Sequence, residues 1–342
     1  MTHYDLIIIG GGPIGLACGI EARNAGLNYL IIEKAALVNS LYHYPVNMTF
    51  FSTSEKLEIG KVPFVSNNRR PARREALEYY RRIVTTFDLN IHFFEEVKEV
   101  TKYGNHKKVI TSLSSYKADN IIVATGFYGL PVMMNVKGEH LRKVKHYYDD
   151  PHFYAFQNVI VVGAANSAID AALETWRKGA RVTLVIRDHE ISQRVKYWVR
   201  PDILNRIKEG AIKVYYDSSI KEIREKEVDI KTPNGKITLP NDWVLAMTGY
   251  RPDMMFLQSM GVKLSNDEVL KPSYNEKTHE SNVKGIYLAG VICGGMNTHK
   301  WFIENCREHA GIIMKDILRK RENANTHKSL IKESKGKQSN RL

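Results

Sequence analysis

The feature that most constrains this chain is a motif that occurs twice. Each copy consists of an apolar strand, a glycine-containing turn, a helix and a second strand that ends in a charged residue. The first copy covers residues 4–33, and the second covers residues 158–187. Two strands joined by a helix are the building unit of a parallel sheet covered by helices. The repeat therefore predicts an α/β protein with two three-layer, Rossmann-like domains.

The glycine spacing of the first copy allows a dinucleotide to approach the backbone. Gly10 permits a tight turn, Gly12 leaves room for a pyrophosphate, and Gly15 lets the helix pack on the strand. The helix N-terminus adds the positive end of its dipole. Glu33 ends the second strand, where a carboxylate accepts hydrogen bonds from a ribose diol. Strand, helix and terminal acid together favour dinucleotide binding over a coincidental glycine turn.

The second copy departs from the first at two informative positions. Ala165 replaces the glycine that usually permits the closest approach of the phosphates, which weakens the motif taken alone. Arg187 stands where the first copy has Glu33, and an arginine there suits a 2′-phosphate. Arg194 is a candidate second phosphate contact. We therefore expect NADPH rather than NADH, the alternative being that Arg187 is only a surface charge.

The order of the remaining strands predicts how the two domains are connected. Apolar strands at residues 120–126 and 243–250 close the two units, and a last strand at residues 285–291 precedes a helix from about Lys300 to Leu318. We expect the last strand to return to the first sheet. The predicted division is residues 1–126 and 251–318 for a discontinuous first domain, residues 127–250 for an inserted second domain, and residues 319–342 for a tail.

The charge of the chain is unevenly distributed. Its formal net charge is +13, and residues 319–342 hold eight basic residues against two acids, a surplus of six. Because this stretch has few apolar residues, we expect a disordered, solvated tail rather than a specific nucleic-acid binder. The remaining positive charge favours NADPH and other anionic substrates.

The cysteines, the histidines and the apolar runs of the chain further limit the kinds of protein that it can be. The three cysteines are too few and too scattered for a disulfide framework, which fits a reducing, cytoplasmic compartment. None of the twelve histidines forms an i, i+4 pair with a neighbouring ligand set, so we expect no metal site. No run of about 18 apolar residues occurs, so a membrane-spanning helix is not expected.

Several longer strings resemble the thioredoxin reductase-like flavoproteins over residues 4–318, and within them the bacillithiol disulfide reductase family. They are Gly10-Gly11-Gly12-Pro13, Tyr42-His43-Tyr44-Pro45, Thr49-Phe50-Phe51-Ser52, Glu55-Lys56-Leu57-Glu58-Ile59-Gly60, Lys143-Val144 with His146-Tyr147, Asn166-Ser167-Ala168-Ile169-Asp170-Ala171-Ala172, Gly249-Tyr250-Arg251-Pro252-Asp253 and Ile303-Glu304-Asn305. The resemblance implies the low-molecular-weight thioredoxin reductase arrangement and a homodimer. It also implies an FAD enzyme that draws on NADPH to reduce a small disulfide such as oxidised bacillithiol.

We predict further cofactor contacts beside the glycine turns and their charged strand ends. The helix near Lys300 is expected to aim backbone N–H groups at the flavin, and some aromatic residues are expected to pack on its ring. The further predicted contacts are Pro13, Lys34, Tyr42, Thr49, Ser52, Ala124, Thr125, Gly126, Gly163, Asn166, Ser167, Ala168, Gly249, Gly290, Val291, Lys300 and Trp301.

The cysteines depart from the patterns of both groups. No Cys-x-x-Cys pair exists, so a dithiol relay is excluded. The bacillithiol family typically carries a cysteine directly after the Gly-Gly-Gly-Pro turn, and this chain has Ile14 there. Cys18 and Cys293 are the candidate substitutes, each weighed against an ordinary structural cysteine, and Cys306 is read as core. Val291 also stands where the wider superfamily usually has an aspartate.

Three alternative functions remain open at this stage. An NADPH-ferredoxin or flavodoxin reductase needs no active cysteine, and the basic surface suits an acidic protein partner. A flavin monooxygenase is suggested by Ala124-Thr125-Gly126 with Pro131 five residues on, although Arg142 stands where that family's second motif has histidine. A non-enzymatic FAD and NADPH sensor is the third.

Overall fold

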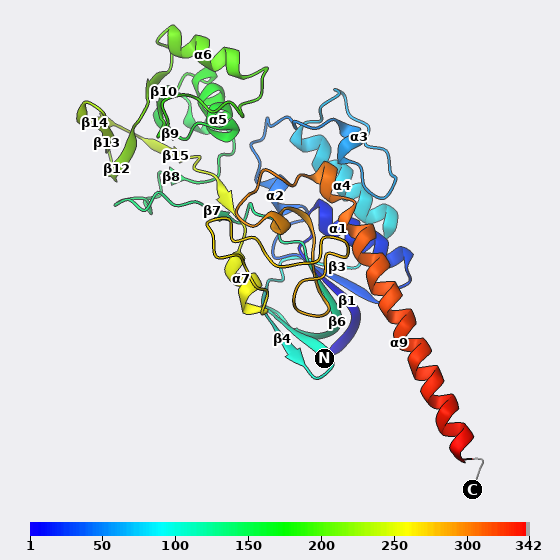
Figure 1. Ribbon diagram of the computed structural model, residues 1–342. Coiled ribbons are helices and arrows are strands. Elements are labelled where there is room, and N and C mark those ends of the chain that lie inside the picture. The colour runs from blue at the N-terminus through cyan, green and yellow to red at the C-terminus, as the bar shows by residue number, and fades with distance from the viewer. Residues whose placement is uncertain (340–342) are drawn as a thin grey trace.

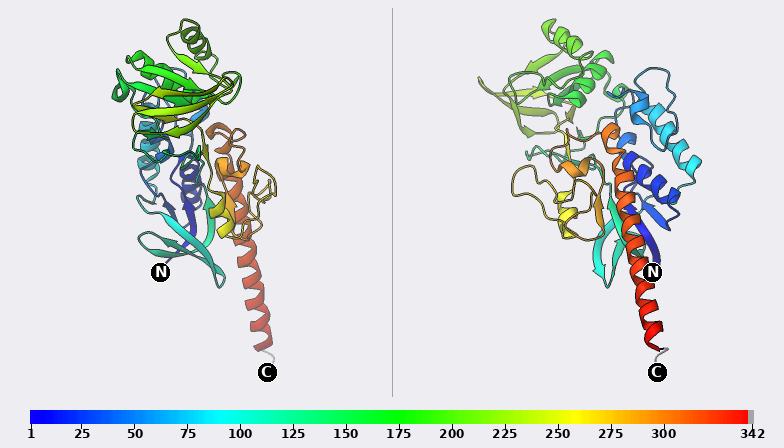
Figure 2. Two further views of the ribbon diagram at one scale, coloured as in Figure 1. Left: turned by 90° about the vertical axis from the view of Figure 1, so that its left-hand side faces the viewer. Right: turned by 45° about the vertical axis from the view of Figure 1, so that its right-hand side comes forward.

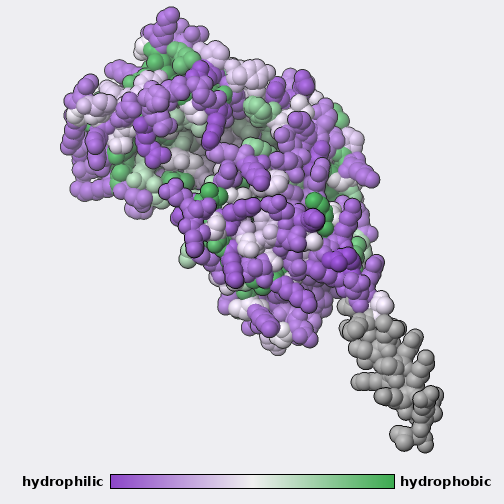
Figure 3. Space-filling model, in the orientation of Figure 1, coloured by the Kyte–Doolittle hydropathy of each residue, from purple (hydrophilic) through white to green (hydrophobic). Residues whose placement is uncertain are grey.

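The computed structural model describes the backbone of residues 1–339 and the side chains of residues 1–323 and 326. It contains two sheet-based domains, drawn in Figure 1 as a green upper body and a lower body that combines blue, cyan and orange segments. Across residues 1–339, no helix is both long and apolar enough to cross a bilayer. Polar residues cover most of the face seen in Figure 3.

The first domain is built on a seven-stranded sheet. Its strand order is β3-β2-β1-β6-β5-β4, and the last strand, β17, pairs with β6. The strands around β1 are parallel, whereas β4, β5 and β6 form an antiparallel meander. The strands are β1 (Thr2–Ile9), β2 (Tyr29–Ile32), β3 (Ile91–His92), β4 (Val97–Tyr103), β5 (His106–Thr111), β6 (Ser115–Val123) and β17 (Ile286–Leu288).

Both faces of this sheet are covered because the last residues of its central strands β1, β2 and β6 are all apolar and buried. Leu6 and Ile8 of β1 point into one core with helices α1, α4 and α9, while Ile7 and Ile9 point into another with α7 and the meander. The helices are α1 (Pro13–Asn24), α2 (Asn39–Tyr42), α3 (Ser54–Leu57), α4 (Arg73–Phe87), α7 (Met254–Ser259), α8 (Ile303–Cys306) and α9 (His309–Ser339), with a 3-10 turn at Gly290–Gly294.

The second domain repeats the plan on a smaller scale. A five-stranded sheet of order β11-β10-β9-β15-β8 lies against a three-stranded antiparallel sheet of order β12-β13-β14. Its elements are β8 (Val144–Lys145), β9 (Asn158–Val162), α5 (Asn166–Arg177), β10 (Arg181–Val185), α6 (Arg200–Lys208), β11 (Lys213–Tyr215), β12 (Ser219–Ile223), β13 (Glu227–Thr232), β14 (Gly235–Pro240) and β15 (Trp243–Ala246), with a 3-10 turn at Pro151–Tyr154.

The chain crosses between the domains twice, and the two crossings lie side by side. β7 (Leu130–Pro131) pairs antiparallel with β16 (Tyr250–Arg251), so the outgoing and returning segments form one short ribbon. After the return, β17 pairs with β6 in parallel. The prediction of an α/β protein with one domain inserted into a discontinuous other is therefore confirmed.

The C-terminal segment differs from its prediction. We expected a helix over residues 300–318 and a disordered tail from residue 319, but α9 begins at His309 and continues to Ser339. Figure 2 shows this helix extending beyond the body of the first domain. The segment contains no proline and no glycine between Gly311 and Gly336, so nothing in the sequence ends the helix where its core contacts end. Residues 340–342 lie outside the described residues.

Candidate functional site

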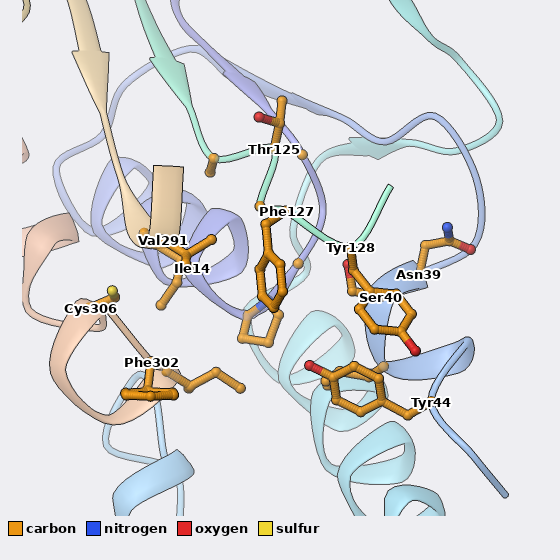
Figure 4. A pocket seen from close by; sticks show the side chains of 18 of the residues that line it. Ile14, Asn39, Ser40, Tyr44, Thr125, Phe127, Tyr128, Val291, Phe302 and Cys306 are labelled. Carbon is orange, nitrogen blue, oxygen red and sulfur yellow. The ribbon is translucent and has the colours of Figure 1, made fainter. Parts of the chain in front are cut away.

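A cavity of about 500 Å³ opens where β1, β2 and β6 of the first sheet end. Parallel strands leave a crevice at their carboxyl ends, which is where ligands bind in open α/β sheets. Figure 4 shows side chains from several separate segments pointing into it. Twelve residues predicted to contact a cofactor line it: Gly10, Gly12, Pro13, Glu33, Lys34, Ser52, Ala124, Thr125, Gly126, Gly290, Val291 and Trp301.

Four other predicted residues of the first domain do not line this cavity. Gly15 lies behind the glycine turn, Tyr42 is mostly exposed, and Thr49 forms an isolated bridge with Ala72. Lys300 is exposed, and α8 begins only at Ile303. The Asn305 side chain explains this later start, since its oxygen accepts the Phe302 N–H at 2.7 Å and its amide donates to the Lys300 carbonyl. The predicted helix N-terminus at Lys300 is therefore wrong.

The first glycine turn has the geometry that its spacing predicts. Gly10 has φ +110°, and a Cβ there would lie 2.5 Å from the Ala124 carbonyl oxygen. A Cβ on Gly15 would lie 1.9 Å from the Gly10 carbonyl oxygen, so only glycine lets α1 pack this closely. A Cβ on Gly12 would meet no atom within 4 Å. The turn therefore presents open backbone to the cavity at Gly12 alone among these three.

Glu33 is a buried carboxylate at the cavity wall. Its two oxygens accept N–H groups from Gly11 at 2.7 Å and from Ala35 at 3.1 Å. Burial raises the pKa of the Glu33 carboxyl, and these hydrogen bonds oppose that shift. Because an ionised carboxylate has about four acceptor sites, two remain for the hydroxyls of a ribose.

Two polar atoms of cavity-lining residues have no partner within the described part of the chain. They are Thr125 Oγ1 and Trp301 Nε1, both shielded from solvent. Buried donors and acceptors are almost always hydrogen-bonded in native proteins. A cavity ligand with polar groups, such as a flavin dinucleotide, is one source of these missing partners.

The cavity also has an aromatic wall that the sequence only partly indicated. Tyr44, Tyr128 and Tyr147 line it, and Tyr250 from the second crossing packs on Tyr128 with ring centroids 3.9 Å apart. The Tyr147 hydroxyl donates to the Tyr128 carbonyl at 2.9 Å. Of the other lining residues, Tyr44, Phe50, Phe51 and Tyr128 are among the aromatic residues expected near the flavin ring. The sequence did not predict the remaining ones as contacts, which are Ile14, Asn39, Ser40, Leu41, His43, Met48, Leu57, Phe127, Gly129, Tyr147, Ala289, Thr298, Phe302, Ile303 and Cys306.

The cysteines are not arranged as the sequence suggested. Cys18 and Cys293 are fully buried and do not line the cavity, whereas Cys306 lies at its wall near Ile14 and Val291 (Figure 4). Burial raises the pKa of the Cys18 and Cys306 thiols to about 12 and that of Cys293 well above its usual range. All three thiols are therefore protonated near neutral pH, and none of them is in a disulfide.

The second glycine turn is built like the first but lies in the other domain. Gly163 has φ +131°, and a Cβ there would lie 2.5 Å from the Met247 carbonyl oxygen and 3.2 Å from the Ala168 side chain. Ala165 is the residue that precedes α5, in extended conformation. Asn166 and Ser167 begin that helix. The Asn166 side chain is already engaged, since its amide oxygen accepts the Lys196 N–H at 2.8 Å.

The two predicted phosphate-binding arginines lie near this second turn. The Gly163 N–H donates to the carbonyl of Val185, which is the last residue of β10. Arg187 follows two residues after the end of this strand. The Arg194 carbonyl accepts a hydrogen bond from the Asn166 side chain. Both arginines are exposed, and neither forms an ion pair with an acid of the described residues. Gly249, with φ +95°, lies apart from them in the second crossing.

Comparison with known proteins places this architecture among redox enzymes. A family model described as pyridine nucleotide-disulphide oxidoreductase matches residues 7–290. Bacilliredoxin reductase Bdr of Bacillus subtilis is 45% identical over 325 residues, which cover 94% of this chain and 100% of that protein. The structure of bacillithiol disulfide reductase Bdr (YpdA) from Staphylococcus aureus is 40% identical, with a TM-score of 0.91 over 94% of this chain and 99% of that one.

A more distant structure shows the shared fold alone. Thioredoxin reductase of T. acidophilum is 18% identical and superposes with a TM-score of 0.73, covering 93% of this chain and 100% of that one. The same two-domain arrangement thus extends well beyond the range in which the sequences are clearly related.

Proposed function

Because the chain belongs to the pyridine nucleotide-disulphide oxidoreductase family, and within it to the bacillithiol disulfide reductases, we propose that it reduces a small disulfide without a cysteine of its own. It is an FAD-dependent enzyme that draws on NADPH. Bound FAD would supply the two-electron chemistry that links NADPH to the acceptor.

The residues of the first domain support a role in holding FAD. Gly12 offers open backbone for the pyrophosphate, and Glu33 keeps acceptor sites for the ribose. Thr125 and Trp301 offer unpartnered polar atoms at the cavity wall. In the second domain, the exposed guanidinium groups of Arg187 and Arg194 are available for the 2′-phosphate of NADPH.

The observation that carries the cysteine-free proposal is the burial of every thiol in the chain. A cysteine attacks a disulfide as the thiolate, and all three thiols here have pKa values raised by burial. Ile14, an apolar β-branched side chain, occupies the cavity wall where related enzymes are expected to carry a cysteine. The acceptor disulfide would then take electrons directly at the cofactor.

The experiment is anaerobic NADPH oxidation by the FAD-loaded protein, with oxidised bacillithiol as acceptor. The triple variant Cys18→Ala, Cys293→Ala and Cys306→Ala is expected to keep its turnover within about tenfold of the original chain. Ile14→Cys serves as the matched variant, because it restores the thiol that the family is expected to use. A loss of about a hundredfold or more in the triple variant would contradict the proposal.

Other acceptors are assayed in parallel. The relatives' names mention a bacilliredoxin as well as bacillithiol disulfide, so an oxidised bacilliredoxin is the first alternative. Ferredoxin and flavodoxin follow, because the positive net charge of +13 suits acidic protein partners. Turnover with one of these proteins and none with the small disulfide would replace the proposed acceptor.

We also propose that the protein works as a homodimer in the cytoplasm. Its cysteines are all free thiols, which fits a reducing compartment. Sedimentation equilibrium of the FAD-loaded chain tests the dimer, and a mass equal to one chain would reject it.

A further inference from the structure

Two histidines and an aspartate gather at the end of the first sheet that lies far from the cavity. His3 belongs to β1, His106 begins β5, and Asp119 lies in β6 between them. The strand register explains the meeting, because β6 pairs with β1 on one side and with β5 on the other. Figure 1 shows the N-terminus at the opposite end of the molecule from the second domain.

Both imidazole rings face the same carboxylate oxygen. His3 Nε2 lies 2.9 Å and His106 Nδ1 lies 2.7 Å from Asp119 Oδ1. The candidate ligand atoms all lie within 4.8 Å of one another. The three side chains are 44%, 40% and 40% exposed in the order His3, His106 and Asp119, so a dissolved ion can reach them.

No cation of the protein competes for this carboxylate within the described residues. The nearby Lys107 ammonium donates instead to the main-chain carbonyl of Asp119, at 2.8 Å. The only ion pairs that the Asp119 carboxylate makes in that part of the chain are those with His3 and His106. The second carboxylate oxygen, Oδ2, has no partner there.

We propose that His3, His106 and Asp119 form a site for a divalent transition-metal ion, with Zn²⁺ as the best-suited ion. Two imidazoles and one carboxylate are a common zinc donor set, and water completes the coordination. Ligand atoms about 2.0–2.2 Å from zinc lie roughly 3.3 Å apart, so the present N···O separations need to open by only about half an ångström. Half-exposed side chains have room to move by that amount.

The protons of the two rings can be placed so that each facing nitrogen binds the metal ion instead of Asp119. Because a carboxylate only accepts hydrogen bonds, the ring nitrogen that faces Asp119 is the one that carries a proton in the metal-free cluster. On metal binding that proton moves to the other ring nitrogen, which is His3 Nδ1 or His106 Nε2. Neither of these atoms has a partner among the described residues. The site would clamp β1, β5 and β6 together and would act on stability rather than on the cavity.

The test is Zn²⁺ binding to the tag-free, FAD-loaded chain, by competition with a fluorescent zinc indicator and by thermal unfolding. The expected result is one Zn²⁺ per chain and a rise in melting temperature of about 2 °C or more, with no rise in Mg²⁺. Asp119→Asn and the double variant His3→Ala and His106→Ala are each expected to lose at least about tenfold in affinity. His152→Ala, an exposed histidine of the second domain, is the matched control and should bind as the original chain does.

A second measurement uses the unaltered chain and so does not depend on how the variants fold. Zn²⁺ should protect His3 and His106, and not His152, from acylation by diethyl pyrocarbonate, as read by peptide mass spectrometry. Absence of Zn²⁺ binding at micromolar concentrations, equal affinity in the variants, or equal labelling of His3 with and without Zn²⁺ would each overturn the proposal.

Discussion

At the scale of single residues, two glycines of the first turn should respond differently to alanine. Gly15→Ala places a methyl group against the Gly10 carbonyl, so we expect unfolding free energy to fall by about 2 kcal/mol or more. In Gly12→Ala the added methyl group contacts no atom, so the unfolding free energy of the apo protein should stay within about 1 kcal/mol of the original value. FAD affinity should fall at least about tenfold, because the methyl group faces the cavity. Urea denaturation of the apo form and FAD fluorescence titration measure the two effects, and equal losses of stability would contradict this division.

A second residue-scale prediction concerns His309, which is buried and accepts the Gly290 N–H on Nδ1. Burial, with a smaller contribution from His279, lowers the pKa of His309 to about 3. Between about pH 6.5 and pH 3 the unfolded chain therefore binds a proton that the folded chain does not, so stability falls as pH falls, by about 1.4 kcal/mol per pH unit.

Urea unfolding of the original chain and of His309→Gln, from about pH 7 down to about pH 5, measures the contribution of His309. It is the difference between the two proteins in the slope of unfolding free energy against pH. The glutamine oxygen can still accept the Gly290 N–H, so the variant should lose less stability on acidification. His152→Gln is the control for an exposed imidazole. Identical slopes in all three proteins would show that His309 titrates normally in the fold.

At the scale of elements, α9 should divide into a part that the fold needs and a part that it does not. The buried Asp316 carboxylate accepts hydrogen bonds from Tyr287, Arg319 and Lys320, and Arg321 pairs with Asp5 at 3.1 Å. A chain ending at Leu318 loses the three basic partners and should be about 1–3 kcal/mol less stable than one ending at Asn323. Chemical denaturation compares the two truncations, and equal midpoints would make those ion pairs irrelevant.

The elements that sequence could predict are those specified by local pattern. The two strand-turn-helix units, the crossings near residues 126 and 250, and the return of the last strand all follow from apolar runs and glycine positions. Contacts set by packing could not be predicted in this way. Cys306 is buried as predicted, but its position at the cavity wall was not predicted, and His3 meets Asp119 only through the register of β1 on β6.

The ends of the helices were also predicted incorrectly from the sequence. The start of α8 depends on one side chain, since Asn305 binds the N–H of the extended Phe302 and the Lys300 carbonyl. The end of α9 was predicted at Leu318 from the loss of apolar residues, but a charged segment without proline continues a helix that the core has already nucleated.

At the scale of the whole molecule, the two domains touch through a small set of side chains away from the crossings. Phe51 stacks on Trp198 with ring centroids 5.7 Å apart, and the Arg70 guanidinium lies over the same indole at 4.5 Å. On another side, the Asn47 amide donates to Glu174 at 3.3 Å. These contacts are few compared with the apolar cores inside each domain.

The four apolar clusters predict how the molecule unfolds. Two of them draw only on residues before 127 or after 253, and the other two draw only on residues 134–247. Because none of these clusters spans both domains, we expect calorimetry of the apo protein to show two transitions. FAD at about a hundred times its dissociation constant should raise one transition by about 5–10 °C and NADP⁺ the other, as binding to one folded domain adds about 2.7 kcal/mol to its stability. A single transition that either ligand shifts as a whole would mean instead that contacts such as Phe51 on Trp198 couple the two cores into one unit.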